Sequence, residues 1–178
     1  MIFTGLIIKH LYRIILLYKT KITAHQNFGV LFIVIFAKIF SMLSILDSEF
    51  SALNTFIQEK NPSQIFILVD ENTHQHCLPT LLGNLDTDIH FEIIEIESGE
   101  DAKNISTVVQ LWEILSDFEA DRKSLLLNLG GGVITDLGGF VASTYKRGIS
   151  FINIPTTLLA MCDASIGGKT GIDHQYLK

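Results

Sequence analysis

Apolar and polar positions follow two different periods along residues 47–178, and these periods predict alternating helices and strands. A continuous apolar run is typical of a strand covered on both faces of a sheet, and one occupies residues 65–69. Further strands are predicted at residues 89–96, 125–129 and 151–154. Apolar residues at three- and four-residue spacing predict helices at residues 50–57, 74–83, 105–115 and 133–143. This alternation predicts an α/β fold with a parallel sheet and helices on its faces.

Residues 1–46 differ from the rest in charge. They contain five Lys or Arg and no Asp or Glu, so their net charge of +5 leaves −11 for the remaining 132 residues. A domain boundary near Asp47 follows, with a basic apolar leader before it. Its longest uncharged apolar run, Asn27 to Ala37, is shorter than the roughly 20 residues of a spanning helix. Three interpretations stay open: non-native sequence, a membrane or targeting segment, and a structured arm.

Composition narrows the class of protein further. Hydrophobic residues make up 48% of the 178 residues and charged residues 18%, which excludes a disordered chain. The net charge of −6 argues against nucleic acid as a partner. Cys77 and Cys162 are too few for a disulfide scaffold or a four-cysteine zinc site, so a reducing compartment fits best.

Candidate chemistry gathers where the predicted strands end, which is where open parallel sheets bind ligands. The strongest feature is the run Gly130-Gly131-Gly132 between a strand and a helix. Three glycines permit positive φ and close backbone approach, and a phosphate can bind at the helix start. The alternative is a tight turn. Gly138 and Gly139, inside the next helix, predict close packing against another element or a ligand.

Four charged residues near these strand ends admit both a structural and a ligand-binding interpretation. Asp136, in the first turn of the predicted helix, either complements the helix dipole or touches a ligand. Asp70 either caps the next helix or holds ribose hydroxyls. Glu100 and Lys103 have the spacing of an exposed ion pair on a helix.

The C-terminal segment 145–178 is the second region rich in candidate residues. Lys169 follows Gly167-Gly168, so its ammonium lies beside flexible backbone that could admit an anion. The run Gly-Gly-Lys-Thr is similar to part of a P-loop. The first glycine of that motif would fall at Asp163, so the motif fails.

Four ordered motifs resemble 3-dehydroquinate synthase. They are GGGVITDLGGF at 130–140, Arg147-Gly148, IPTTLLA at 154–160 and DASIGGKTGID at 163–173. The resemblance covers roughly residues 47–178 and implies a Rossmann-like NAD-binding domain. It also implies the reaction of the shikimate pathway in which 3-deoxy-D-arabino-heptulosonate 7-phosphate becomes 3-dehydroquinate and phosphate. That reaction uses NAD, returned unchanged, and a divalent metal, zinc or cobalt.

The resemblance also implies roles for individual residues. Substrate-site residues would be Arg147, Asp163 and Lys169, whose charges suit a substrate with a carboxylate and a phosphate. Lys169 would also lie near NAD. The other residues implied to contact NAD are Asp70, Ser98, Gly99, Glu100, Lys103, Gly131, Gly132, Val133, Asp136, Thr156, Thr157 and Lys178.

The chain also departs from the family pattern. Family members are about twice as long, and their helical C-terminal domain supplies the Glu and two His that bind metal. This sequence ends at Lys178, before that domain, so we expect an incomplete NAD-binding domain at 47–178, no metal ligands and no turnover by this chain alone. His74, His76 and Cys77 are interpreted as helix-surface residues. The complete enzyme is expected to be a cytoplasmic homodimer, with membrane association through residues 1–46 left open.

Other functions stay open beside this one. A related sugar-phosphate cyclase of the 2-deoxy-scyllo-inosose synthase type shares the NAD cycle, and its discriminating residues lie mainly in the absent half. Iron-dependent alcohol and glycerol dehydrogenases share the strand–glycine–helix turn but lack the run at 163–170. The third alternative is a nucleotide-binding remnant without catalysis.

Overall fold

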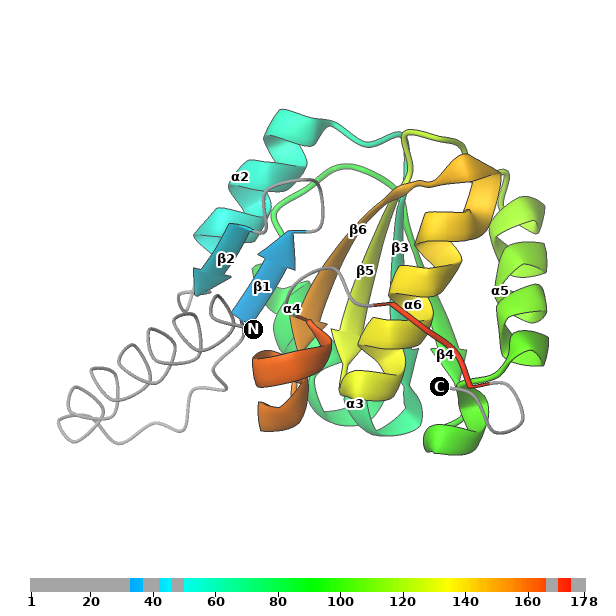
Figure 1. The fold of residues 1–178 in the computed structure, drawn as a ribbon. Coiled ribbons are helices and arrows are strands. Elements are labelled where there is room, and N and C mark those ends of the chain that lie inside the picture. The colour runs from blue at the N-terminus through cyan, green and yellow to red at the C-terminus, as the bar shows by residue number, and fades with distance from the viewer. Residues whose placement is uncertain (1–32, 37–41, 46–49, 166–169, 174–178) are drawn as a thin grey trace, which may run out of the picture. The chain divides into compact units, whose positions relative to one another are not determined.

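The structure is a computed structural model that describes residues 33–36, 42–45, 50–165 and 170–173. Four neighbouring strands of its sheet run parallel (Figure 1). They are β3 (Ile65–Asp70), β4 (Phe91–Ile96), β5 (Leu125–Gly130) and β6 (Ser150–Pro155). The predicted Rossmann-like parallel sheet is therefore confirmed, and each strand begins within two residues of its predicted start.

An antiparallel hairpin extends this sheet at one edge. Strand β1 (Ile33–Phe36) pairs with β2 (Met42–Ile45) and with β6, so the sheet order is β2-β1-β6-β5-β3-β4. The sheet thus includes backbone from before Asp47, where the charge pattern suggests a boundary. The rest of residues 1–46 lies outside the described ranges, and the boundary stays a prediction.

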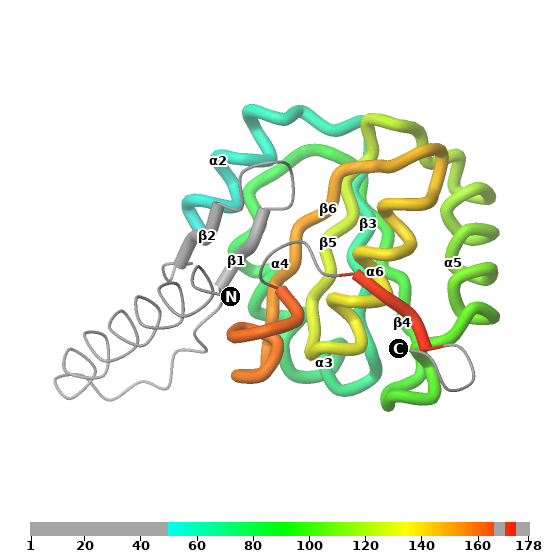
Figure 2. The backbone as a smooth tube through the Cα atoms, in the orientation of Figure 1, coloured from blue at the N-terminus to red at the C-terminus, as the bar shows by residue number. Residues whose placement is uncertain are grey.

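Helices cover both faces of the parallel strands. One face packs against α2 (Ser51–Lys60) and α4 (Leu78–Asn84), with Leu53 and Leu81 fully buried. The other face packs against α5 (Ile105–Asp117) and α6 (Gly132–Thr144), and Figure 2 shows the chain of α6 running across the strands. Because β5 is buried along its whole length, its continuous apolar sequence reflects cover on both faces.

The helix predicted at 74–83 is two helices. Helix α3 (Glu71–His76) ends at Cys77, and α4 begins directly after it, with Pro79 in its first turn. Proline fits there because the first turn of a helix does not need its N–H, and this explains the break inside an apparently continuous pattern. Among the helices of the described ranges, none is long and apolar enough to cross a membrane.

Candidate functional site

The carboxyl ends of the parallel strands bring the candidate residues to one edge of the sheet (Figure 1). Strand β5 ends at Gly130 directly opposite Pro155 of β6. The Thr156 N–H donates to the Gly130 carbonyl at 3.0 Å, which holds the Thr156–Thr157 segment beside the glycine turn. The hydroxyl of Thr157 accepts from the Ala160 N–H at 3.2 Å and so begins the next helical turn. Sequence motifs 26 residues apart therefore meet here.

The glycine turn, residues 130–132, lets neighbouring groups pack close to the backbone without positive φ. Gly131 is extended (φ −76°, ψ −165°), and in the described ranges only Gly99 and Gly148 among the glycines have positive φ. The positive φ that glycine permits is therefore not used at 130–132. What requires glycine at 130 is the following helix, since a Cβ there would lie 2.5 Å from Ile134 Cβ. At Gly132 a Cβ would lie 3.8 Å from Ala164 Cβ, in ordinary van der Waals contact, so a Cβ fits here without a clash.

Helix α6 begins at Gly132 with its first N–H groups uncovered by any side-chain cap. Such uncapped N–H groups, together with the positive end of the helix dipole, favour a bound anion. Thr135 is fully buried, and its hydroxyl donates to the carbonyls of Gly131 and Gly132 at 3.1 and 3.2 Å. The sequence analysis missed Thr135. Its position four residues after Gly131 is the signal that could have revealed this contact.

Lys103 and Asp136 form a shielded ion pair behind the glycine turn. Lys103 Nζ donates to Asp136 Oδ2 at 2.7 Å, and the two side chains are 13% and 20% exposed. The interpretation of Lys103 as half of an exposed pair with Glu100 was therefore wrong. Asp136 also lies beyond the first turn of α6, which contains no acidic residue, so its main contact is Lys103 rather than the helix dipole.

This ion pair makes stability depend on pH at the alkaline end. Burial would lower the pKa of Lys103, but the hydrogen bond to Asp136 and the charges of Asp136, Glu100 and Asp173 outweigh it and raise that pKa. A raised folded pKa stabilises the fold below the unfolded value, about 10.4, and the contribution disappears as pH rises through the folded pKa. We expect urea midpoints between pH 8 and 11.5 to fall more steeply at the alkaline end for the natural chain than for Lys103→Met. Parallel curves for the two proteins would contradict this.

A cavity of about 330 Å³ lies against the ion pair. The exposed Asp163 lines it together with Lys103, Asp136 and the segment 170–173. That segment crosses α6 in Figures 1 and 2, and two backbone hydrogen bonds hold it: Gly171 N–H to Asp136 O at 3.2 Å and Asp173 N–H to Lys103 O at 2.8 Å. The structure thus brings Lys103, Asp136 and Asp163 together around one cavity.

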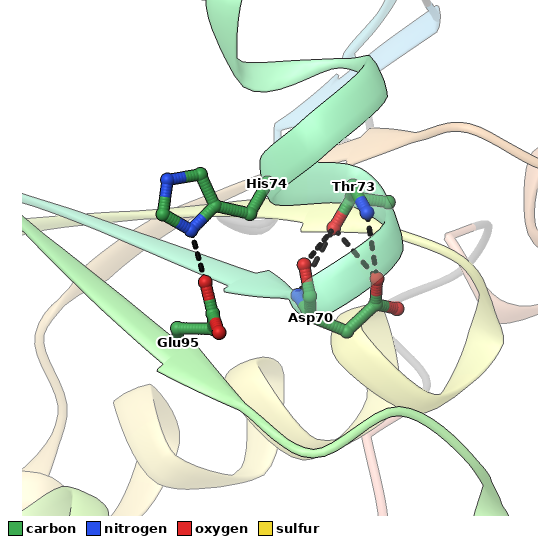
Figure 3. Close-up of polar contacts among 4 residues, drawn as sticks. All are labelled: Asp70, Thr73, His74 and Glu95. Atoms are coloured by element: carbon green, nitrogen blue, oxygen red, sulfur yellow. Dashed lines mark hydrogen bonds and ion pairs between the residues drawn. The ribbon is translucent and has the colours of Figure 1, made fainter.

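Asp70 caps the helix that follows its strand (Figure 3). Its Oδ1 accepts from the Thr73 N–H at 2.8 Å, and its own N–H donates to Thr73 Oγ1 at 3.0 Å. The structural interpretation of Asp70 is therefore confirmed, and its ribose contact stays a prediction. Nearby, Ser98 Oγ donates to Glu71 at 3.1 Å, and Gly99 adopts φ +111°, which favours glycine, before the short helix at Glu100–Ala102.

The His74–Cys77 segment forms no metal site with the residues that the structure describes. His74 contacts Glu95 of the neighbouring strand, as Figure 3 shows, and both are exposed. Burial, aided by the charge of Asp70, raises the pKa of the Cys77 thiol. No group of three or more His, Cys, Asp or Glu is placed to hold a metal within the described ranges. A metal site of Glu and His ligands therefore does not fit this part of the chain.

Among the described residues, Arg147 does not join the cluster. Arg147 is exposed and lies in the short helix Tyr145–Arg147, which begins directly after α6 ends at Thr144. Thirteen helical residues separate that end from the glycine turn, which is about 20 Å at 1.5 Å per residue. The substrate role of Arg147 stays a prediction. Lys169 and Lys178 lie outside the described residues.

Comparison with known proteins bears on the family to which the sequence is similar. The family model described as 3-dehydroquinate synthase N-terminal matches residues 93–178. The 3-dehydroquinate synthase of Parabacteroides distasonis is 46% identical over 72% of this chain and 36% of its own length. That of Pyrococcus abyssi is 46% identical over 74% of this chain and 39% of its own length. The chain thus spans little more than a third of the curated relatives it matches.

Two solved structures of known enzymes have a fold similar to that of this chain. A 2-deoxy-scyllo-inosose synthase complexed with carbaglucose-6-phosphate, NAD+ and Co2+ gives a TM-score of 0.60 at 25% identity, over 70% of this chain and 34% of that one. A 2-epi-5-epi-valiolone synthase from Streptomyces hygroscopicus with NAD+ and Zn2+ bound gives a TM-score of 0.59 at 33% identity, over 66% of this chain and 33% of that one.

The fold is therefore similar to that of part of the sugar-phosphate cyclases of known structure. Within that class, the sequence is similar to 3-dehydroquinate synthase in particular, and the resemblance carried by the four motifs is confirmed.

Proposed function

We propose that this chain supplies the NAD-binding half of a 3-dehydroquinate synthase. One observation carries the proposal: the glycine turn, the uncapped start of α6 and Thr156 lie together at the carboxyl edge of the sheet. A dinucleotide pyrophosphate suits this place because Gly132 presents no side chain and the helix start favours an anion. NAD would supply reversible hydride transfer, which turns a hydroxyl into a ketone and acidifies the neighbouring proton so that phosphate can leave.

The residues of this chain would bind and orient the reactants. The first N–H groups of α6 would bind the pyrophosphate, and Lys103 and Asp136 would face the cavity beside it. Asp163, exposed at the same cavity, can accept hydrogen bonds from substrate hydroxyls. Arg147 and Lys169 would match the substrate's negative charges. The phosphorylated sugar acid itself, and the choice of this cyclase reaction over that of 2-deoxy-scyllo-inosose synthase, belong to the proposal.

We further propose a cytoplasmic, homodimeric complete enzyme. The free thiols Cys77 and Cys162 suit a reducing compartment. Leu158 and Leu159, 69% and 72% exposed beside the glycine turn, form an apolar surface that suits cover by further protein.

The 178-residue chain alone is expected to release no phosphate from 3-deoxy-D-arabino-heptulosonate 7-phosphate. The described residues offer no metal site, and metal catalysis in such a reaction supplies several kcal/mol of charge stabilisation. Purified chain is assayed with NAD and Zn2+, and its zinc content is measured after dialysis. Turnover above background, or stoichiometric zinc, would show this proposal wrong.

A completed protein tests the proposed chemistry. We expect phosphate release when residues 1–178 are fused to the part of the Parabacteroides distasonis relative that follows the matched region. In this fusion, Lys169→Ala should lower kcat by roughly 100-fold or more, as expected for loss of one preorganised charge contact. Lys60→Ala, which removes an exposed lysine at the end of α2, is the matched control. An active fusion that tolerates Lys169→Ala would remove Lys169 from the site.

A further inference from the structure

Two asparagines form a polar pair inside an otherwise apolar layer between the sheet and helices α5 and α6. Asn128 is fully buried and Asn153 is 3% exposed. Asn128 Nδ2 donates to Asn153 Oδ1 at 2.8 Å, and the two residues stand opposite each other on β5 and β6. The side-chain bond therefore crosses between the two strands that carry the glycine turn and Thr156.

Stability alone does not explain this pair. A buried amide is unfavourable unless its groups are hydrogen-bonded, and Asn128 Oδ1 has no hydrogen-bond partner among the described residues. A Cβ at position 138 would lie 2.0 Å from that oxygen, so the Cα–H of Gly138 points at it. Such a contact is weak. Two apolar side chains of similar shape would suit this layer at least as well, so the pair needs another explanation.

The strand sequences supply that explanation. Residues 125–129 of β5 and 151–154 of β6 are apolar toward both faces except for the two asparagines. A slip of two residues would keep every side chain on its original face and still bury apolar groups, so hydrophobicity specifies the register weakly. Only the observed register pairs the two amides. A single buried Asn fixes register in coiled coils for the same reason.

We propose that Asn128 and Asn153 lock the register of β5 against β6 and thereby align the two parts of the site. The observed register sets Gly130 opposite Pro155 and lets the Thr156 N–H reach the Gly130 carbonyl. Asn128 and Asn153 are positioning residues, buried two residues before the strand ends. The effect on dinucleotide binding rests on the proposed function, whereas the effect on register does not.

The test replaces both amides in the full chain, as Asn128→Leu with Asn153→Leu. We expect the urea midpoint to stay at or above that of the natural chain. Hydrogen exchange of the Thr156 amide should accelerate at least tenfold, while amides between β3 and β4 keep their rates. The NAD dissociation constant should rise at least tenfold. The matched control is Leu127→Ile with Ile152→Leu, the neighbouring register pair on the other face, which should change none of these quantities.

Two results would overturn the register lock. One is a hydrogen-exchange rate of the Thr156 amide in the double variant that equals the rate in the natural chain. The other is loss of cooperative unfolding both in this variant and in Asn128→Ala with Asn153→Ala, which would show that the amides serve global stability. If the natural chain does not bind NAD, the proposed function fails, and the exchange measurement still decides whether the amides fix the register.

Discussion

Replacing Gly138 with alanine is expected to destabilise the fold by about 1–3 kcal/mol, the range for overpacking a well-filled core. The new Cβ would lie 2.0 Å from Oδ1 and 2.4 Å from Cγ of Asn128. Asn128 cannot move aside easily, because it is fully buried and hydrogen-bonded to Asn153. Equilibrium urea unfolding of the natural chain and the variant measures the difference.

Gly83→Ala provides the matched control for this substitution. Gly83 also lies in a helix, α4, but a Cβ there would have nothing within 4 Å. Alanine should therefore stabilise the chain by about 0.5–1 kcal/mol through its better helix propensity. If Gly138→Ala is as harmless as Gly83→Ala, the close contact between α6 and Asn128 is not present in the protein.

Replacing Gly132 with valine is expected to abolish NAD binding while the chain remains folded. A Cβ at position 132 would lie 3.8 Å from Ala164 Cβ, in ordinary van der Waals contact, so the first carbon of a side chain fits without a clash. The proposed pyrophosphate would occupy the same space at the start of α6. Calorimetric titration with NAD compares the natural chain with Gly132→Val, and thermal unfolding confirms that the variant is folded.

Gly132→Ala should give an intermediate NAD affinity, because a methyl group blocks less of the same space. Equal NAD affinity in all three proteins would remove the glycine turn from the proposed site. A large loss of thermal stability in Gly132→Val would instead show that the valine methyl groups clash with protein atoms, and would contradict the expectation that the variant stays folded.

The central strands were predictable because burial on both faces leaves a direct trace in sequence. The residues of β5 are buried throughout, and its apolar run appears without interruption except at Asn128. The hairpin of β1 and β2 was not predicted, since its apolar residues sit in a leader whose charge pattern suggests a separate segment. The charge pattern shows where the composition of the chain changes, but it does not show which strands pair. Strand pairing depends on which edge of the sheet is free.

The sequence predicted which residues gather at the site better than it predicted which of them contact one another. Parallel strands all end at one edge, so residues 70, 98–103, 130–136 and 156–157 were expected to gather there. The Lys103–Asp136 bond joins residues 33 positions apart, and local spacing favoured Glu100 as the partner of Lys103. The glycine turn avoids positive φ because the tight contact with Ile134, rather than a left-handed backbone, requires Gly130.

A titration of the isotope-labelled full chain with NAD, followed by the NMR shifts of its backbone amides, tests the central claim most directly. The account predicts saturable shifts at Gly131, Gly132, Val133 and Thr156, where the uncapped helix start meets β6. Amides around the hollow of about 530 Å³ between α2 and the end of α4, such as Asn54 and Asn84, should not move. Absence of shifts at the glycine turn, or saturable shifts at that hollow instead, would contradict the account.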